Sequence, residues 1–255
     1  MEKTTQPIIT VNNLVKKYGD FTAVNDVSFS VNEGEVFGLL GPNGAGKTTT
    51  LEIIETLRES TSGTVSVDGI DVSKDPQDVK RRIGIQLQSS GFYPGLNLVE
   101  LMEMFALMYG VKIDPLKMLA EFQLTEKAKS TYDKMSGGQK QRFSLATTLI
   151  NQPRVIFLDE PTTGLDPQAR VNLWQVIQEI KKKGVTVVIT THYMDEAEQL
   201  CDRLAIMDHG KIISQGSPAE LIDALLKGGF KRHTEVRAAT LEDVFLSLTG
   251  RSIRE

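Results

Sequence analysis

Short apolar runs alternate along the chain with segments whose apolar residues recur at helical spacing. Three of these runs are continuously apolar, which is typical of parallel strands covered on both faces. They are VFGLL (36–40), VIFLD (155–159) and VTVVIT (185–190). Helical patterns follow them at 47–57, 167–183 and 193–200. The alternation predicts an α/β fold built on a central parallel sheet.

Different patterns precede and follow this core. Residues 8–15 and 22–31 alternate apolar and polar side chains, which predicts a half-exposed antiparallel sheet near the N-terminus. Residues 204–216 read as a β-hairpin with its turn at His209 and Gly210. Residues 97–150 contain no convincing strand and several helical patterns, which predicts a helical insertion.

These patterns suggest a division of the chain into two parts. We expect residues 1–227 to form one α/β domain, with the helical insertion at about 90–150. Residues 228–255 would form a tail that ends in a short helix, LEDVFLSLTG. No internal repeat and no low-complexity tract interrupts this organisation.

Composition narrows the functional classes. A formal net charge of −4 gives no reason to expect direct nucleic-acid binding, which usually shows as a basic excess. The single cysteine, Cys201, excludes an internal disulfide and suits a reducing compartment. Residues 1–10 carry no signal-peptide pattern, and the apolar runs are far below the roughly 20 residues that span a bilayer. We therefore expect any membrane role to depend on a partner.

The strongest chemical motif is GPNGAGKT at 41–48, which matches the phosphate-binding P-loop between a predicted strand and a predicted helix. Its glycines let backbone N–H groups converge on phosphate oxygens. Lys47 would neutralise the β- and γ-phosphates, and the Thr48 hydroxyl would bind Mg²⁺. The expected nucleotide-binding residues are Gly41, Pro42, Asn43, Gly44, Ala45, Gly46, Lys47, Thr48 and Thr49.

Acidic and imidazole side chains end two of the other predicted strands. Asp159 would organise Mg²⁺, and the adjacent Glu160 would polarise a water for attack on the γ-phosphate. The strand VTVVIT leads to His192. Because ligands in open α/β sheets bind beyond the carboxyl ends of the strands, we expect all three residues to meet the P-loop.

A second glycine motif, MSGGQ at 135–139, opens another helical pattern. A serine followed by two glycines at a helix N-terminus can hold an anion, or it can simply cap the helix. The P-loop already provides a phosphate site, so the residues alone do not explain why one chain carries two such loops.

Together these motifs resemble the ATPase subunit of ATP-binding cassette (ABC) transporters. GPNGAGKT is similar to the Walker A motif, VIFLDEP to Walker B with its catalytic glutamate, and MSGGQ to the signature LSGGQ. TTGLDP resembles the D-loop and TTH the switch histidine, and the likeness covers nearly the whole chain in the family's order. Met135 and Gly164 are mild departures from the family pattern.

The resemblance implies an ATPase that works as a dimer with a second copy of itself. In the family, the signature of one subunit contacts the γ-phosphate of the ATP that the P-loop of the other subunit holds. The residues implied here are Ser136, Gly137, Gly138 and Gln139. Tyr18 matches the aromatic residue that stacks on adenine. For the Q-loop glutamine, which would contact Mg²⁺ or the attacking water, Gln88 is preferred over Gln86.

The resemblance also implies a separate transmembrane permease and a peripheral position on the cytoplasmic face of a bacterial or archaeal membrane. The helical insertion carries Met102, Met104 and Met108, which could line a groove for a permease helix. Core packing of an amphipathic helix is the favoured alternative for these side chains. GFYPGLN at 91–97 would lie at the permease contact. The C-terminal segment ATLEDVFLSLTGR resembles the corresponding segment in the ATPases of ABC-2-type exporters for drugs and antibiotics.

Other P-loop proteins fit the sequence less well. A soluble cassette ATPase that acts on ribosomes would usually carry two cassettes, and a chromosome or repair ATPase would separate its motifs by a long coiled coil. Lys47 and Ser136 are only 89 positions apart. A P-loop kinase or small GTPase would have no use for SGGQ. The sequence therefore favours a transporter ATPase and leaves the substrate open.

Overall fold

The computed structural model describes residues 7–86, 91–230, 244, 247 and 248. Within them, six strands form the central sheet in the order β10-β9-β3-β8-β7-β6. Neighbouring strands are parallel, except for the antiparallel pair β9 and β10. The strands are β3 (Val36–Leu40), β6 (Ile83–Gln86), β7 (Val155–Asp159), β8 (Thr186–Thr191), β9 (Arg203–Asp208) and β10 (Lys211–Gly216). The expected parallel sheet and the C-terminal hairpin are confirmed.

A second, antiparallel sheet packs beside the first, as the alternating N-terminal pattern predicts. Its order in the described residues is β2-β1-β4-β5. The strands are β1 (Pro7–Tyr18), β2 (Phe21–Asn32), β4 (Ser62–Val67) and β5 (Ile70–Asp71). Strands β4 and β5 and the short helix α2 (Pro76–Arg82) were not predicted from the sequence, because each has too few apolar residues to show a clear period.

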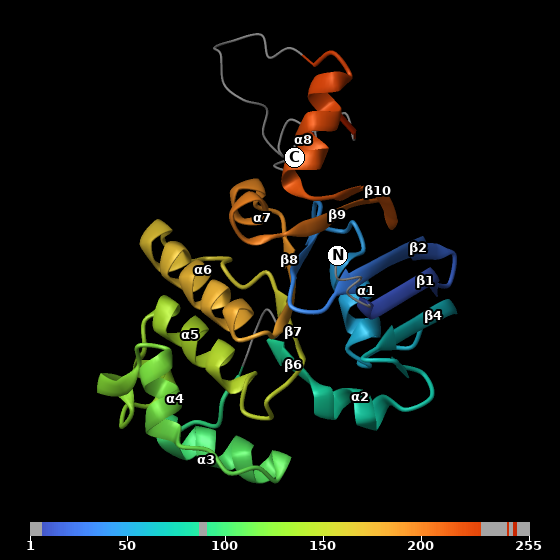
Figure 1. The fold of residues 1–255 in the computed structure, drawn as a ribbon. Helices are drawn as coiled ribbons and strands as arrows, with labels where there is room; N and C mark the ends of the chain where they lie inside the picture. The colour runs from blue at the N-terminus through green and yellow to red at the C-terminus, as the bar shows by residue number, and fades with distance from the viewer. Residues whose placement is uncertain (1–6, 87–90, 231–243, 245–246, 249–255) are drawn as a thin grey trace, which may run out of the picture.

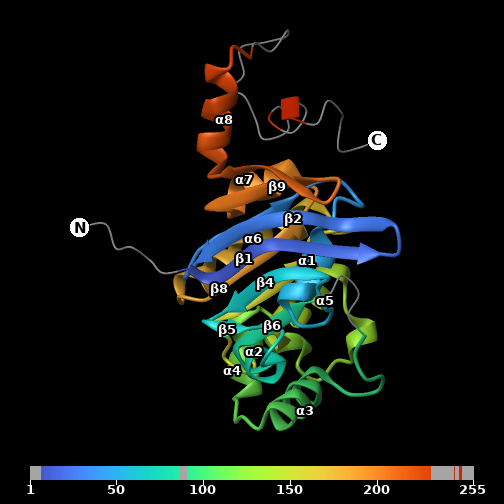
Figure 2. The same ribbon diagram turned by 90° about the vertical axis from the view of Figure 1, so that its right-hand side faces the viewer.

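The remaining helices pack mainly on the other face of the central sheet (Figure 1). They are α3 (Leu98–Tyr109), α4 (Pro115–Glu121), α5 (Gly137–Thr147), α6 (Pro167–Lys182), α7 (Met194–Leu200) and α8 (Pro218–Lys227), with 3₁₀ turns at Thr125–Lys127 and Tyr132–Lys134. Helix α6 connects β7 to its parallel neighbour β8. Figure 2 shows α8 and α3 at opposite ends of the molecule.

Two hydrophobic cores hold these layers together, one on each face of the central sheet. Alternate side chains of β7 point to opposite cores: Ile156 and Leu158 pack with the helical side, and Val155 and Phe157 pack with the antiparallel sheet. Helix α1 (Lys47–Ile54) belongs to the second core and α5 to the first. The helices that begin at the two glycine motifs therefore lie on opposite faces of the sheet.

The methionines of the helical insertion divide between core and surface. Met102 is fully buried, Met104 is partly buried, and Met108 is 74% exposed. Core packing, the favoured alternative, thus applies fully to Met102 and partly to Met104, but not to Met108. Leu107 and Tyr109 are exposed beside Met108 at the end of α3.

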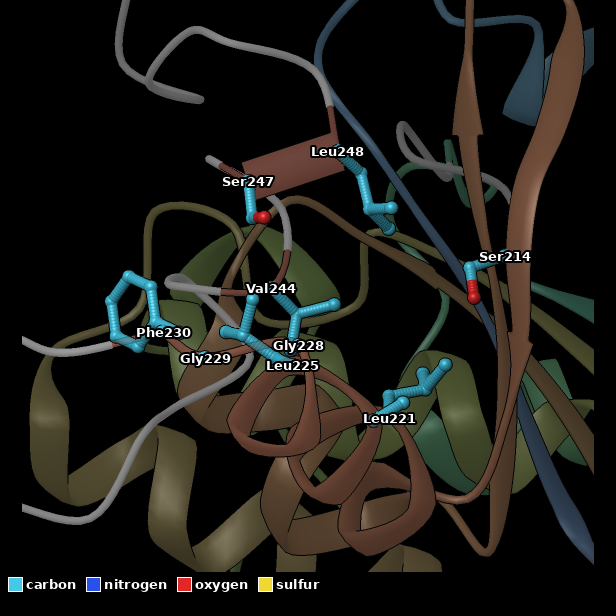
Figure 3. A pocket seen from close by; sticks show the side chains of 10 residues that line it. Ser214, Leu221, Leu225, Gly228, Gly229, Phe230, Val244, Ser247 and Leu248 are labelled. Carbon is cyan, nitrogen blue, oxygen red and sulfur yellow. The ribbon is translucent and has the colours of Figure 1, made fainter.

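An apolar cavity of about 410 Å³ lies between α8, β10 and the C-terminal residues (Figure 3). Leu221, Leu225 and Val244 line it, with Ser214 contributing a hydroxyl. Most of the expected tail and its last helix fall outside the described residues. No residue of the two glycine motifs lines this cavity.

Candidate functional site

The P-loop leads directly into α1 and leaves the start of that helix open. Gly46 precedes the helix with φ 98°, and no side chain of the described residues caps it. The first turn also carries no acidic residue. The N–H groups of this turn and the positive end of the helix dipole are therefore available to an anion. A Cβ at Gly46 would lie 2.5 Å from the Ala23 carbonyl oxygen, so only glycine fits.

The turn between β9 and β10, together with the end of β9, packs against the backbone of the P-loop. The Gly210 N–H donates to the Ala45 carbonyl at 3.0 Å. A Cβ at Gly41 would lie 2.2 Å from the Met207 carbonyl oxygen, which shows how closely the two backbones approach. The other predicted loop residues differ in exposure: Asn43, Gly44 and Thr48 are exposed, whereas Pro42 and Thr49 are partly buried. The loop thus presents one open face.

Lys47 extends along the P-loop toward the ends of the strands. Its ammonium donates to the Gly41 carbonyl at 2.7 Å and to the Pro42 carbonyl at 3.1 Å, and lies 3.6 Å from Glu160 Oε1. Burial lowers the pKa of Lys47, although Glu160 and Asp159 oppose this effect by favouring the charged form. The side chain therefore holds a partly desolvated positive charge beside the helix N-terminus.

Asp159, the last residue of β7, faces the start of α1. The Thr48 hydroxyl lies 3.4 and 3.3 Å from its two carboxylate oxygens, and the Thr190 hydroxyl donates to Oδ1. Burial raises the pKa of Asp159, and the neighbouring Glu160 adds to this, while the two threonine hydroxyls act in the opposite direction. A hydroxyl and a buried carboxylate thus converge at the P-loop, as the sequence predicts.

Glu160 adopts a left-handed backbone with φ 47°, an uncommon conformation for a residue with a side chain. Its N–H donates to the backbone carbonyl and the hydroxyl of Thr190, at 3.2 and 3.0 Å. Its carboxylate accepts from the Thr163 hydroxyl at 3.3 Å. His192 follows β8, and its Nδ1 lies 3.3 Å from Glu160 Oε1. The structure therefore brings Glu160, His192 and Lys47 together.

Thr190 and Thr163 are site residues that were not predicted from the sequence. Thr190 bridges two neighbouring strands, because its hydroxyl contacts Asp159 while its carbonyl accepts from Glu160. The available signal was the threonine pair that ends an otherwise apolar strand at 190–191. Fully buried polar residues at a strand's end need partners, and the Thr190 hydroxyl finds them in Asp159 of β7 and in the N–H of Glu160.

The second glycine motif forms the N-terminus of α5. Ser136 Oγ accepts from the Gln139 N–H at 3.4 Å, and Gln139 Oε1 accepts from the Ser136 N–H at 3.1 Å. This capping box confirms that the motif caps the helix. It leaves the N–H groups of Gly137 and Gly138 without a capping side chain from the described chain, so the motif keeps its capacity to hold an anion.

The same helix end packs against the segment that follows Glu160. The Gln141 side-chain amide donates to the Pro161 carbonyl. A Cβ at Gly138 would lie 3.0 Å from Ala169 Cβ at the start of α6, so glycine permits this close approach. A shift of residues 161–166 would therefore change the contacts at the N-terminus of α5.

Two further predicted residues lie away from this cluster or outside the described structure. Tyr18 ends β1 and is 41% exposed, with Lys16 Nζ 5.2 Å and the Arg58 guanidinium 5.4 Å from its ring centre. Gln88 lies outside the described residues, so its role remains a prediction. Gln86, the alternative, is the last residue of β6 and is buried.

Comparison with known proteins agrees with this arrangement. A family model described as "ABC transporter" matches residues 24–163, which is more than half of the chain. The chain belongs to the ABC transporter family. It is an ATP-binding and ATP-hydrolysing subunit of such a transporter. This resolves the alternatives of the sequence analysis in favour of the transporter ATPase rather than a ribosome-acting cassette.

Curated relatives and solved structures support this membership in the ABC family. The chain is 37% identical to a Nod factor export ATP-binding protein I of Burkholderia orbicola, over 97% of this chain and 98% of the relative. It is 39% identical to a linearmycin resistance ATP-binding protein of Bacillus subtilis, over 86% and 72%. A structure titled as an ATP-binding subunit of an ABC transporter superposes with a TM-score of 0.81 at 29% identity, covering 95% and 99%.

A dimeric cassette, MJ0796 bound to ADP and Pi in a post-hydrolysis state, is also similar to this ABC ATPase. Its TM-score is 0.73 at 28% identity, covering 82% of this chain and 98% of that one. Among the residues that the structure describes, no helix has the length and apolar character that a bilayer crossing needs.

Proposed function

We propose that two copies of this ABC subunit hydrolyse MgATP at shared sites and drive a separate transmembrane permease. Two observations support this proposal. The first is the convergence of Lys47, Glu160 and His192 at one edge of the sheet. The second is that α5, the helix that begins at the signature motif, lies on the opposite face of the sheet from α1. The first arrangement provides the chemistry of ATP hydrolysis. The second supports the proposal that the anion site at α5 serves a nucleotide held by another chain.

Mg²⁺ fits the residues at the end of β7. The Thr48 hydroxyl and the Asp159 carboxylate are hard oxygen donors, and burial of Asp159 disfavours its charge unless a cation is close. Two protein donors suit Mg²⁺, which is usually held by one or two side chains together with substrate phosphates. Bound there with ATP, the ion would neutralise charge on the phosphates, and Gln88 is proposed as a further ligand.

The side chains around this site have separate roles. Lys47 stabilises negative charge on the β- and γ-phosphates. Glu160 is the general base that accepts a proton from the attacking water, and its left-handed backbone turns the carboxylate toward Lys47 and His192. His192 stabilises the charge of the transferred phosphoryl group. Tyr18 stacks on adenine.

The second copy completes the site. We assign the N–H groups of Gly137 and Gly138, with Ser136 and Gln139, to the γ-phosphate bound by the partner's P-loop. The packing of Gln141 on Pro161 and of Gly138 on Ala169 supports coupling, because it ties this anion site to the segment after Glu160. The solved dimer of a similar cassette supports the same assembly for this chain.

The surface of the helical insertion is the proposed docking site for the permease. Tyr93, Leu107 and Leu116 are exposed by 68%, 82% and 55% and lie on or next to α3 and α4, together with Met108. Exposed apolar side chains gathered on one subdomain are typical of a protein contact. Phe92 anchors the segment before α3 by packing on Tyr132 and Phe143.

Export is the proposed direction, since the similar proteins are named for Nod factor export and linearmycin resistance. We place the subunit at the cytoplasmic face of the membrane, where its permease would lie. Residues 1–227 are proposed as the ATPase domain and 228–255 as its tail.

Replacement of the proposed base tests the shared-site mechanism. Glu160→Gln keeps the shape of the side chain and removes the proton acceptor, so ATP binding should persist while turnover falls at least about 100-fold. Gel filtration with MgATP should then show a stable dimer that the wild type forms only transiently. Glu179→Gln, an exposed change on α6, is the control and should behave as wild type. Normal turnover by Glu160→Gln would overturn the assignment of the base.

A further inference from the structure

A buried carboxyl next to the site has no role in the chemistry described above. Glu196 lies in α7, one turn after His192, and is fully buried. Its Oε1 accepts from the Trp174 indole N–H at 3.1 Å. Its Oε2 accepts no hydrogen bond from any residue that the structure describes. An incompletely paired carboxyl in a core is costly, so its presence calls for a reason other than packing.

Glu196 lies between the two segments that carry the catalytic pair. Thr191, the residue before His192, and Thr162, two residues after Glu160, are both about 1% exposed. Burial raises the pKa of Glu196, and the hydroxyls of Thr191 and Thr162 partly oppose this effect, which places both beside the carboxyl. The Thr191 hydroxyl also accepts from the Tyr193 N–H at 3.0 Å.

Two donors beside this carboxyl are as incompletely paired as Oε2. The Thr162 hydroxyl is buried and reaches hydrogen-bonding geometry with none of the described residues, and the same holds for Arg170 Nε. Arg170 also contacts the residues that follow His192: its guanidinium lies 4.5 Å from the Tyr193 ring centre, and its Nη1 lies 3.2 Å from the Asp195 carboxylate. Two donors and one acceptor without a partner among the described residues are thus buried in the same part of the core.

The segment that carries Thr162 is the one in contact with the signature helix. Pro161 accepts from Gln141 of α5, and Gly137 of α5 lies 3.8 Å, measured from an added Cβ, from Leu165. A movement of α5 that accompanies closure on a second copy would therefore displace residues 161–165. Thr162 lies between the two residues of this segment that α5 contacts, Pro161 and Leu165.

We propose that Glu196 is a positioning residue that couples the loop after Glu160 to the turn that carries His192. In the closed dimer, the Thr162 hydroxyl donates to Glu196 Oε2, and this bond holds His192 against Glu160. The coupling lets a signal from the signature helix set the catalytic geometry. This inference rests on the proposed roles of Glu160 and His192.

Thr162→Val tests the coupling with little risk to the fold. Valine keeps the shape of threonine, and the lost hydroxyl forms no hydrogen bond within the described structure. We expect kcat to fall about tenfold, with an unchanged KM for ATP and a thermal midpoint that is not lowered. Thr162→Ser, which restores the hydroxyl, should recover most of the kcat. Wild-type kcat in Thr162→Val, or a change confined to KM, would overturn the proposal.

A double-mutant cycle identifies the partner of that hydroxyl. Glu196→Gln retains the shape but changes the acceptor, and we expect it to lower kcat as well. If the two residues form one contact, the double variant should be no slower than the slower single variant. Losses that multiply would overturn the assignment of Glu196. Failure of the proposed function itself is distinguishable, because it would appear as normal turnover in Glu160→Gln, whatever Thr162→Val does.

Discussion

The Lys47 ammonium lies 3.6 Å from Glu160 Oε1. One residue opens the helix after the P-loop and the other follows β7, 113 positions further along the chain. Both side chains are largely shielded from solvent, so their opposite charges interact more strongly than they would at the surface. This pairing places the phosphate-binding charge and the proposed base within reach of the same phosphoryl group.

Removal of the Lys47 charge should abolish tight ATP binding. We expect Lys47→Ala to weaken ATP affinity at least about tenfold, because a charge-assisted contact to phosphate is lost in a partly desolvated site. Isothermal titration calorimetry measures this directly. Lys74→Ala, which removes an exposed lysine paired with Asp71, provides a control with the same change in net charge. Equal affinities in the two variants would contradict the role of Lys47.

The hydroxyl of Thr190 should matter for Mg²⁺ dependence as well as for stability. Thr190→Val removes a bond to Asp159 and another to Glu160 N–H. Thr186→Val, on the same strand, removes only the acceptor of the Gly34 N–H. We expect both to lose about 1 kcal/mol or more of unfolding free energy, but only Thr190→Val to need more Mg²⁺ for half-maximal hydrolysis. Identical Mg²⁺ titrations would count against the Asp159 assignment.

A bulky residue at Ser136 should separate nucleotide binding from hydrolysis. Ser136→Leu blocks the proposed contact with the partner's ATP, so we expect hydrolysis to fall roughly 100-fold while binding by the single chain persists. Ser217 caps α8 with the same kind of capping box, at 3.2 Å from Glu220 N.

Ser217→Leu is therefore a matched control for the loss of a helix cap. Both substitutions should cost about 1 kcal/mol of stability, but only the change at Ser136 should stop hydrolysis. Steady-state ATPase assays at several protein concentrations measure the effect. Unimpaired hydrolysis by Ser136→Leu would rule out the shared site.

Glu55 should make the fold less stable as pH rises. It is 2% exposed, and burial, together with the charges of Asp159 and Glu52, raises its pKa to about 8. The folded chain therefore binds a proton that the unfolded chain, with an ordinary pKa of 4.5, releases. Stability from this group is fully present below about pH 4.5 and is lost progressively toward pH 8, at up to about 1.4 kcal/mol per pH unit.

Glu55→Gln isolates that contribution. Glutamine cannot ionise, so urea denaturation should show a weaker loss of unfolding free energy between about pH 6 and pH 8.5 than in the wild type. At the upper end of that range the variant should be the more stable protein. Parallel pH profiles for the two proteins would contradict the raised pKa of Glu55.

Elements with strong periodic patterns were predictable from the sequence. The strands at Val36–Leu40 and Val155–Asp159 match the predicted runs residue for residue, because a strand buried on both faces must be apolar throughout. The short strands β4 and β5 were missed because half-exposed segments with few apolar residues carry little pattern. The pairing of β4 with β1 is a long-range choice that local sequence does not encode.

The predicted site residues on the P-loop and at the ends of β7 and β8 could be placed together in advance for a simple reason. Parallel strands end at one sheet edge, so residues that follow them must be neighbours. The supporting contacts were not predictable in the same way. Thr190 and Thr163 lie within the quoted motifs TTH and TTGLDP, but the motifs assign them no role, and Glu196 lies in none of the quoted motifs. Only the burial and the partners of these residues reveal what they do.

By itself the sequence determined the α/β class, the phosphate-binding loop and the order of the family's motifs, because these follow from local periodicity and backbone chemistry. Tertiary structure alone decided that α1 and α5 lie on opposite faces of the sheet, so that each chain holds its P-loop apart from its own signature. It also decided which polar groups are buried together, as at Glu196. Burial and charge pairing depend on which distant segments pack against one another, and that packing is a property of the whole fold.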